Sequence, residues 1–352
     1  MNIESKLLQA RLPLFRIVAS VVAIFAAAPV AHAADPNPVT SIFKPLSAPA
    51  EMVYETSLLA LLICAGIFVV VGGLLTYAVI KFRARPGDEQ QEPPQIYGSN
   101  QIELAWTVIP ILIVFVLVLV TARTIADVQN AKLPDDALQV RVVGHQWWWE
   151  IHYPAYGVVT ANELHLPVSS RTHRRPTALK LESADVAHSF WVPQLAGKTD
   201  VIPNRANTMW VEPYATGTYL GNCAEFCGTQ HARMLLRVVV ESPEDFAQWM
   251  AAQQQPAAVD PAVQAGRDLF MKTSCVNCHR IAGTLAVGVF GPDLTRLMTR
   301  ETIAAGAARN TTADLRAWVR DPQTLKPGCL MPNMQLTDPQ VDQIVSYLQT
   351  LK

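Results

Sequence analysis

Two short stretches of the sequence concentrate residues that can bind metals or attach a cofactor. The first, residues 223–234, reads CAEFCGTQHARM and combines two cysteines, one histidine and one methionine. Thiolate and thioether sulfurs are soft ligands that select copper, zinc or iron–sulfur clusters. Copper electron-transfer sites commonly add a weak axial methionine, so this spacing favours copper. A structural zinc site and a disulfide between Cys223 and Cys227 are the alternatives.

The second stretch, residues 275–279, reads CVNCH and has the spacing of covalent c-type haem attachment. In that chemistry Cys275 and Cys278 form thioethers with the haem, and His279 lies under the iron. A thioredoxin-like redox pair is the alternative, but such a pair needs a βαβ setting that this helical segment lacks.

A class I cytochrome c needs a sixth iron ligand near its C-terminus. Met331, directly before Pro332, fits this role best, and Met334 is the rival. The segment GPDL at 291–294 resembles the haem-packing loop of class I cytochromes c, which implies that the carbonyl of Pro292 orients the His279 ring.

Short strand-like segments surround the first motif. They are rich in Val, Leu and Trp, are separated by turns, and lie at 138–143, 177–181, 208–212 and 235–240. Such spacing predicts an all-β sandwich or barrel over residues 133–250. A ligand loop between strands resembles cupredoxins, in which a second histidine comes from an earlier loop, and His188 is the best candidate.

The second motif lies in a segment with helical patterns. Residues 251–258 read AAQQQPAA, a low-complexity stretch that predicts a linker. Residues 259–352 then predict an all-α domain, with helical patterns at 260–271, 312–319 and 338–351.

The N-terminus reads as an export signal over residues 1–33. A positively charged region precedes an apolar stretch too short to span a membrane, and Ala31-His32-Ala33 has the small-x-small pattern of a cleavage site. We expect cleavage after Ala33, and an uncleaved anchor helix is the alternative.

Two uncharged apolar runs, 57–80 and 104–122, predict a transmembrane helical hairpin over residues 53–127. Lys81, Arg83 and Arg85 follow the first run, so the positive-inside rule places the connecting loop in the cytoplasm. Both ends of the mature chain would then lie outside, in agreement with an export signal. A buried soluble hairpin is the alternative, and two uncharged runs of this length argue against it.

The composition suits a membrane protein with soluble domains and argues against nucleic-acid binding. Half of the residues (50%) are hydrophobic and 16% are charged, which suits apolar membrane segments combined with soluble domains. The net charge of −1 leaves no basic excess for nucleic acid. Residues 133–250 carry a slight acidic excess and residues 258–352 a slight basic one, which favours docking of the two domains.

Four motifs together resemble subunit II of the haem-copper cytochrome c oxidases. They occur in the family's order over about residues 50–250, as GHQWWWE (144–150), DVAHSFWVP (185–193), KTDVIP (198–203) and the 223–234 loop. This resemblance implies a dinuclear copper centre, CuA. It also implies a ligand set in which Cys223 and Cys227 bridge both coppers, His188 and His231 are terminal ligands, and Met234 and the backbone carbonyl of Glu225 are weak axial ligands.

The resemblance implies three further roles. The Glu225 side chain would help to hold a Mg²⁺ ion shared with subunit I, since a carboxylate suits that hard ion. Trp147 matches the family's electron-entry tryptophan, and Glu103 matches the mouth of a proton path into subunit I. The alternatives are a solvated loop acid for Glu225, aromatic packing for Trp147 and a solvated boundary acid for Glu103.

The motifs together predict a multidomain subunit II of an aa3-like oxidase. It would combine a two-helix transmembrane hairpin, an all-β cupredoxin-like domain and a fused all-α class I cytochrome c domain. Electrons would pass from an external donor, such as a cytochrome c or a membrane complex, to haem c, then to CuA and to haem a of subunit I. There oxygen would be reduced to water with proton pumping.

This assignment also predicts location and partners. The chain would be a multi-pass protein of the bacterial inner (plasma) membrane, with its CuA and haem c domains on the periplasmic side. Its partners would be the lipid bilayer and oxidase subunits I and III, but no nucleic acid. Two other functions are the alternatives. A stand-alone membrane-anchored electron carrier would not co-purify with subunit I, and a copper-binding assembly protein would need only one metal ion and no haem.

Overall fold

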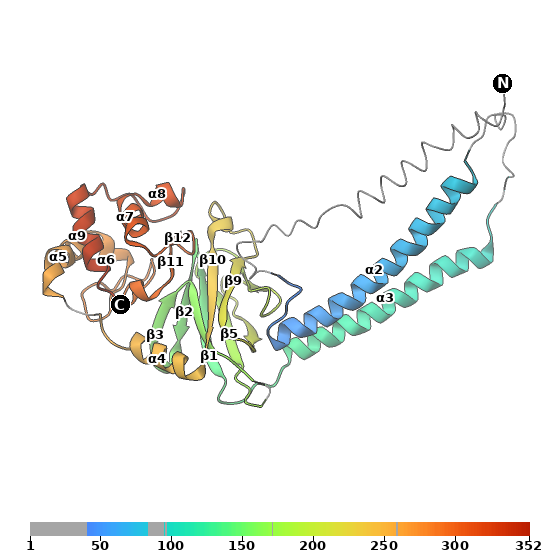
Figure 1. Cartoon of the computed structure of the whole chain (residues 1–352), viewed down its shortest axis with the longest axis horizontal. Coiled ribbons are helices and arrows are strands. Elements are labelled where there is room, and N and C mark those ends of the chain that lie inside the picture. Colours follow the sequence, from blue (N-terminus) through green and yellow to red (C-terminus); the bar gives the residue numbers. More distant parts are fainter. Residues whose placement is uncertain (1–40, 84–94, 96, 171, 258–259) are drawn as a thin grey trace, which may run out of the picture. The chain divides into compact units, whose positions relative to one another are not determined.

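The computed structural model describes residues 41–83, 95, 97–170, 172–257 and 260–352. The predicted export signal at 1–33 and Arg85 of the charged loop lie outside the described residues. The described chain contains two long apolar helices, a β-sandwich and a helical C-terminal region (Figure 1).

The two apolar helices confirm the predicted hairpin. Helix α2 spans Ala48–Lys81 and α3 spans Asn100–Gln129, and both are long and apolar enough to cross a membrane. They lie side by side, and the hydroxyl groups of Thr56 and Thr124 are 2.7 Å apart. Most of their side chains are exposed in the isolated chain, as expected of surfaces that contact lipid.

The predicted all-β domain is a sandwich of two five-stranded sheets. The first sheet has the order β3 (Val158–Ala161), β2 (Trp148–Tyr153), β1 (Leu138–His145), β5 (Thr177–Ser183) and β8 (Asn207–Val211). The second has the order β4 (Glu163–Pro167), β10 (Leu235–Glu241), β9 (Gly217–Cys223), β6 (His188–Trp191) and β7 (Thr199–Val201). Short 3-10 helices follow β2 at Pro154–Tyr156 and precede β10 at His231–Arg233.

Alternating side chains explain how the two sheets pack. Along β10, Leu236, Val238 and Val240 are buried, while the residues between them are only partly buried. This period of two is typical of a strand with one face on the core. The inward side chains meet Trp149 and Tyr153 of β2 in a single apolar core.

A helix that the sequence prediction missed, α4 (Pro243–Gln253), follows β10. It covers the first three residues of the stretch 251–258, so the irregular part of the predicted linker begins at Gln254. Ala251, Ala252 and Gln253 are good helix formers and continue α4 into this stretch. At the other end of α4, the Ser242 side chain caps the helix by accepting from the Asp245 amide.

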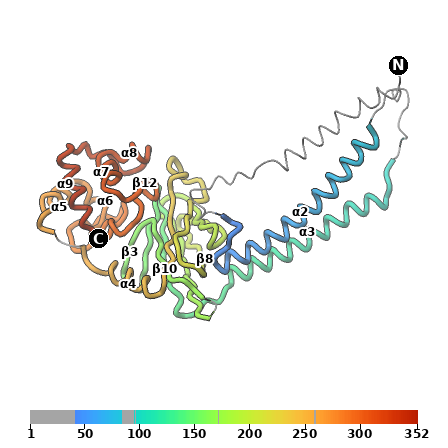
Figure 2. The backbone as a smooth tube through the Cα atoms, in the orientation of Figure 1, coloured from blue at the N-terminus to red at the C-terminus, as the bar shows by residue number. Residues whose placement is uncertain are grey.

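The C-terminal region is mainly helical (Figure 2). It has its own apolar core. Its helices are η5 (Pro261–Val263), α5 (Gln264–Lys272), α6 (Cys275–Cys278), η6 (Leu297–Thr299), α7 (Thr312–Arg320), α8 (Pro322–Leu325) and α9 (Asp338–Leu348), with a short hairpin of β11 (Thr302–Ile303) and β12 (Ala308–Arg309). Helices α5 and α9 approach closely at Gly266, where a Cβ atom would lie 2.0 Å from the Gln343 carbonyl oxygen. The three predicted helical segments correspond to η5 with α5, to α7 and to α9.

Candidate copper centre and haem site

His188 begins β6, and its imidazole is fully buried. Its Nε2 atom lies 2.7 Å from Oδ1 of Asp185, and its Nδ1 atom lies 3.9 Å from the Cys223 sulfur. The facing sheet leaves room for the ring at Gly144, where a Cβ atom would lie 2.8 Å from Cδ2 of His188. The GHQWWWE motif therefore needs glycine at position 144, because a larger residue would clash with the His188 ring.

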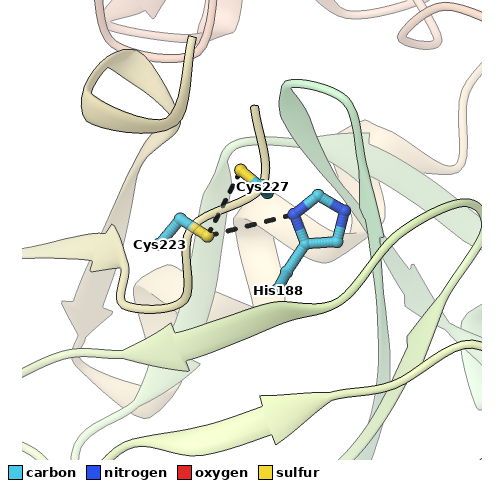
Figure 3. Close-up of side chains that lie close together, drawn as sticks. All are labelled: His188, Cys223 and Cys227. Atoms are coloured by element: carbon cyan, nitrogen blue, oxygen red, sulfur yellow. Dashed lines mark hydrogen bonds between the residues drawn. The ribbon is translucent and has the colours of Figure 1, made fainter. Parts of the chain in front are cut away.

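Cys223 ends β9 and Cys227 follows in the loop, so both thiols lie beside His188 (Figure 3). The two sulfurs are 3.7 Å apart, far beyond the ~2.05 Å of a disulfide, and both cysteines are free. The donor atoms of all three residues lie within 4.8 Å of one another. The structure therefore has a compact sulfur–nitrogen cluster here and no disulfide.

The other predicted copper ligands meet the same two sulfurs. His231 Nδ1 lies 3.6 Å and the Met234 sulfur 3.8 Å from the Cys227 sulfur. The carbonyl oxygen of Glu225 lies 3.2 Å from the Cys223 sulfur. The structure thus brings together all the donors that the sequence pointed to: two thiols, two imidazoles, a thioether and a carbonyl.

The ionisation of the two thiols is strongly unequal. A hydrogen bond from Cys227 lowers the pKa of Cys223, and the contact with His188 acts in the same direction. The same contact and burial raise the pKa of Cys227, because a second thiolate so close to the first would repel it. A bound cation would remove this repulsion.

The donor set fits a pair of copper ions. Six donors exceed the four that close a structural zinc site, and soft sulfur with imidazole suits copper. Cys223, Cys227 and Met234 are almost completely buried, which excludes water from the sulfurs. Among the described residues, this is the only convergent group of at least three His, Cys, Asp or Glu donors, and the exposed Glu225 carboxylate is outside it.

Trp147 connects this cluster to a second site. Its indole nitrogen donates to the carbonyl oxygen of Cys227 at 3.0 Å, and the amide of Gln146 donates to the same oxygen at 2.8 Å. The Trp147 side chain also lines a cavity in which Cys275 and Cys278 lie. Trp147 is therefore shared by the walls of both sites.

The second site is a cavity with the haem-attachment residues in its wall. Cys275, Cys278 and His279 line it, and His279 Nδ1 lies 2.8 Å from the carbonyl oxygen of Pro292. Burial lowers the pKa of His279, which keeps the imidazole neutral, the form that binds iron. At Gly291 a Cβ atom would lie 2.7 Å from the His279 ring, so glycine is required there.

Arg300 shows that the cavity also suits the acidic edge of a haem. Its side chain lines the cavity and is buried, yet its Nε atom has no hydrogen-bond partner. Its Nη2 donates to the Asp293 carbonyl oxygen, so the guanidinium is held in place. A carboxylate such as a haem propionate would satisfy the free donor. Arg300 was not predicted as a site residue, because nothing nearby in the sequence marks a buried arginine.

Both candidate sixth ligands, Met331 and Met334, line this cavity and are partly buried. Cys329 lies on the same wall, where its sulfur accepts from the Gln323 amide. Glu103 lies in the first turn of α3 with an exposed side chain and belongs to neither site.

Comparison with known families assigns each of the three main parts of the described chain. Residues 36–123 match the transmembrane domain of cytochrome c oxidase subunit II, and residues 138–242 match the periplasmic domain of the same subunit. Residues 263–352 match the cytochrome c family. The order of the three matches is the order predicted from the motifs.

Individual relatives agree with these matches. Cytochrome c oxidase subunit 2 of Alkalihalophilus pseudofirmus is 33% identical over 311 residues, covering 86% of this chain and 88% of the relative. The Bacillus subtilis subunit 2 is 30% identical over 337 residues, covering 90% and 93%. The solved periplasmic domain of subunit II from Bradyrhizobium japonicum is 28% identical, covers 35% of this chain and 97% of that domain, and has a TM-score of 0.32.

The geometry, the family matches and the relatives give one assignment. The chain belongs to the cytochrome c oxidase subunit II family, as a membrane protein with two transmembrane helices, a periplasmic domain and a C-terminal cytochrome c domain.

Proposed function

We propose that this chain takes electrons from an external donor at haem c, passes them to CuA and delivers them to haem a of subunit I. The observation that carries this proposal is the double contact of Trp147, which lines the haem cavity and donates to the Cys227 carbonyl oxygen. One aromatic side chain thus touches both sites. When bound, the copper pair and the haem would each carry one electron at a time.

The residues of the copper cluster have separate roles in this proposal. The copper pair would be held by the Cys223 and Cys227 thiolates, the His188 and His231 imidazoles, the Met234 thioether and the carbonyl of Glu225. It would supply one-electron redox chemistry there. Asp185 holds the His188 ring with Nδ1 directed to the cluster, and burial keeps water away from the sulfurs.

In the haem domain, Cys275 and Cys278 would hold the haem covalently and His279 would be its proximal ligand. The Pro292 carbonyl fixes the orientation of the His279 ring. Met331 would be the second protein ligand of the iron, since thioether ligation raises the potential, as an electron carrier requires.

The domain boundaries and partners extend the same proposal. A signal peptide at 1–33 would precede the hairpin (53–127), the copper domain (133–250), the linker (251–258, whose first three residues end helix α4) and the haem domain (259–352). Subunits I and III would bind in the inner membrane, with the copper and haem domains on its periplasmic side. Glu103 would lie at a proton-path mouth, and Glu225 would share a Mg²⁺ ion with subunit I.

A flash-reduction experiment on the purified oxidase tests the electron path. After photochemical reduction of haem c, the CuA absorption should bleach as haem c reoxidises. Trp147→Leu should slow this step about tenfold, because the aromatic contact between the sites is lost. Trp249→Leu is the matched control, since Trp249 stacks on His165 away from both sites. Reduction of CuA without any passage through haem c would overturn the proposal.

A further inference from the structure

Two buried charged side chains cross between the copper domain and the haem domain. Lys326 of the haem domain is 3% exposed and Glu163 of the copper domain is 2% exposed. Neither forms an ion pair with any described residue. Because an unpaired buried charge is costly, each must be stabilised by hydrogen bonds.

The Lys326 ammonium uses all three of its N–H donors on backbone carbonyls. They accept at 2.8 Å (Trp147), 2.9 Å (Arg233) and 3.1 Å (Ala304). Two of these acceptors belong to the copper domain. Arg233 directly precedes Met234, and Trp147 contacts the Cys227 carbonyl, so the ammonium is anchored to the backbone around the copper cluster.

The residues on either side of Lys326 are held by the copper loop, residues 223–234. The Arg233 guanidinium donates to the carbonyl oxygen of Leu325, and the Gln230 amide donates to that of Pro327. The next residue, Gly328, has a positive φ of 81°, and a Cβ atom there would lie 2.9 Å from Cγ2 of Thr229. The segment 325–328 therefore lies directly on the copper loop, and it leads to Met331.

Glu163 makes the converse contact. Its carboxylate, at the start of β4, accepts from the backbone amides of Glu301 and Thr302 and from the Thr302 hydroxyl, at 2.9 to 3.1 Å. All of these donors belong to the haem domain. Lys326 of the haem domain thus binds carbonyls of the copper domain, and Glu163 of the copper domain binds amides of the haem domain.

Such paired contacts favour one docked arrangement over all others. In water both charges would be solvated, so their burial adds little affinity, but any other register would leave a buried charge or several backbone groups unsatisfied. We propose that Lys326 and Glu163 are positioning residues that hold the haem domain on the copper domain in one register, so that electrons pass between the two sites without a docking movement. This inference rests on the proposed electron path.

The rate and viscosity dependence of internal electron transfer test the inference in the purified oxidase. In the wild-type protein, transfer from flash-reduced haem c to CuA should follow one exponential and be independent of added glycerol. Lys326→Met keeps the aliphatic stem but removes the donors. It should slow transfer at least tenfold and make it viscosity-dependent, while the haem c spectrum and the CuA EPR signal show that both centres are retained. Exposed Lys272→Met is the matched control.

Glu163→Gln tests the same register from the other domain. An amide presents its own N–H donors to the donors of Glu301 and Thr302, so transfer should again slow and become viscosity-dependent. If Lys326→Met does not fold, Glu163→Gln tests the positioning role in its place. Rates within twofold of wild type and independent of viscosity, with both centres intact, would overturn the inference. Absence of transfer from haem c to CuA in the wild-type protein would instead overturn the proposed path.

Discussion

The Nε2 atom of His188 lies 2.7 Å from Oδ1 of Asp185. This contact places the ring proton on Nε2 and leaves the Nδ1 lone pair directed to the Cys223 sulfur, 3.9 Å away. The same carboxylate accepts from the backbone amides of Gln146 and Val186. Asp185 is therefore fixed from three sides and orients the histidine before any metal arrives.

Replacing Asp185 should weaken copper binding. Asp185→Ala removes the group that sets the tautomer, and loss of such a partner typically costs 10- to 100-fold in metal affinity. Asp185→Asn keeps an acceptor oxygen and should lose less. Chelator competition against the copper-free protein measures both affinities, with exposed Asp135→Ala as the control. Equal affinity in the wild type and in Asp185→Ala would refute the orienting role.

Met234→Leu should change the copper centre and leave the haem untouched. The Met234 sulfur is fully buried and lies 3.8 Å from the Cys227 sulfur, whereas the haem cavity does not include it. Leucine preserves most of the volume but offers no ligand. We expect an altered CuA EPR spectrum with intact haem c bands. Met250→Leu, at an equally buried methionine of α4, is the control, and simultaneous loss of both spectra would argue against two separate centres.

Replacing each methionine of the haem cavity by leucine shows which of the two binds the iron. Met331→Leu should lower the haem c midpoint potential and let carbon monoxide bind the ferrous haem, because the distal position becomes free. Met334→Leu should do neither and is the matched control, since both side chains line the cavity. Carbon monoxide binding by Met334→Leu alone would reverse the assignment.

Local spacing was enough to predict most of the fold and to point to the two cysteine-containing motifs. Alternation in segments such as 235–240 predicted strands, and the CVNCH motif predicted haem attachment at residues that line a cavity in the structure, because both signals lie within a few residues. Helix α4 was missed because its residues 251–253 read as low-complexity sequence.

Contacts between distant segments left no such signal. Lys326 and Glu163 lie far apart in the sequence and look like ordinary surface charges, yet both are buried at a domain boundary. The opposite net charges of the two domains suggested docking through surface attraction. The contacts between the two domains include buried charges bound to backbone groups and one partly exposed ion pair, Arg237 with Glu301.

Glu150 on β2 is a further charge that only the structure explains. Its Oε2 lies 3.3 Å from Nε2 of His145 and 3.1 Å from Nε2 of His152, and the His145 ring stacks on Trp148. Burial would raise the pKa of Glu150, but the contacts with the two histidines outweigh it and lower the pKa to about 2. The ionised carboxylate therefore stabilises the folded β-sandwich.

The pH dependence of unfolding follows from the sign of this shift. A lowered pKa in the folded state stabilises the protein fully above the ordinary glutamate pKa, and this contribution is lost as the pH falls from about 4.5 to about 2. Glu150→Gln should lower the free energy of unfolding near pH 6 by about 3 kcal/mol and flatten its acid dependence. Urea titrations at pH values from 2 to 7, followed by tryptophan fluorescence, measure both effects. Exposed Glu244→Gln should retain the wild-type slope, and an unchanged slope in Glu150→Gln would show that the histidine contacts do not stabilise the fold.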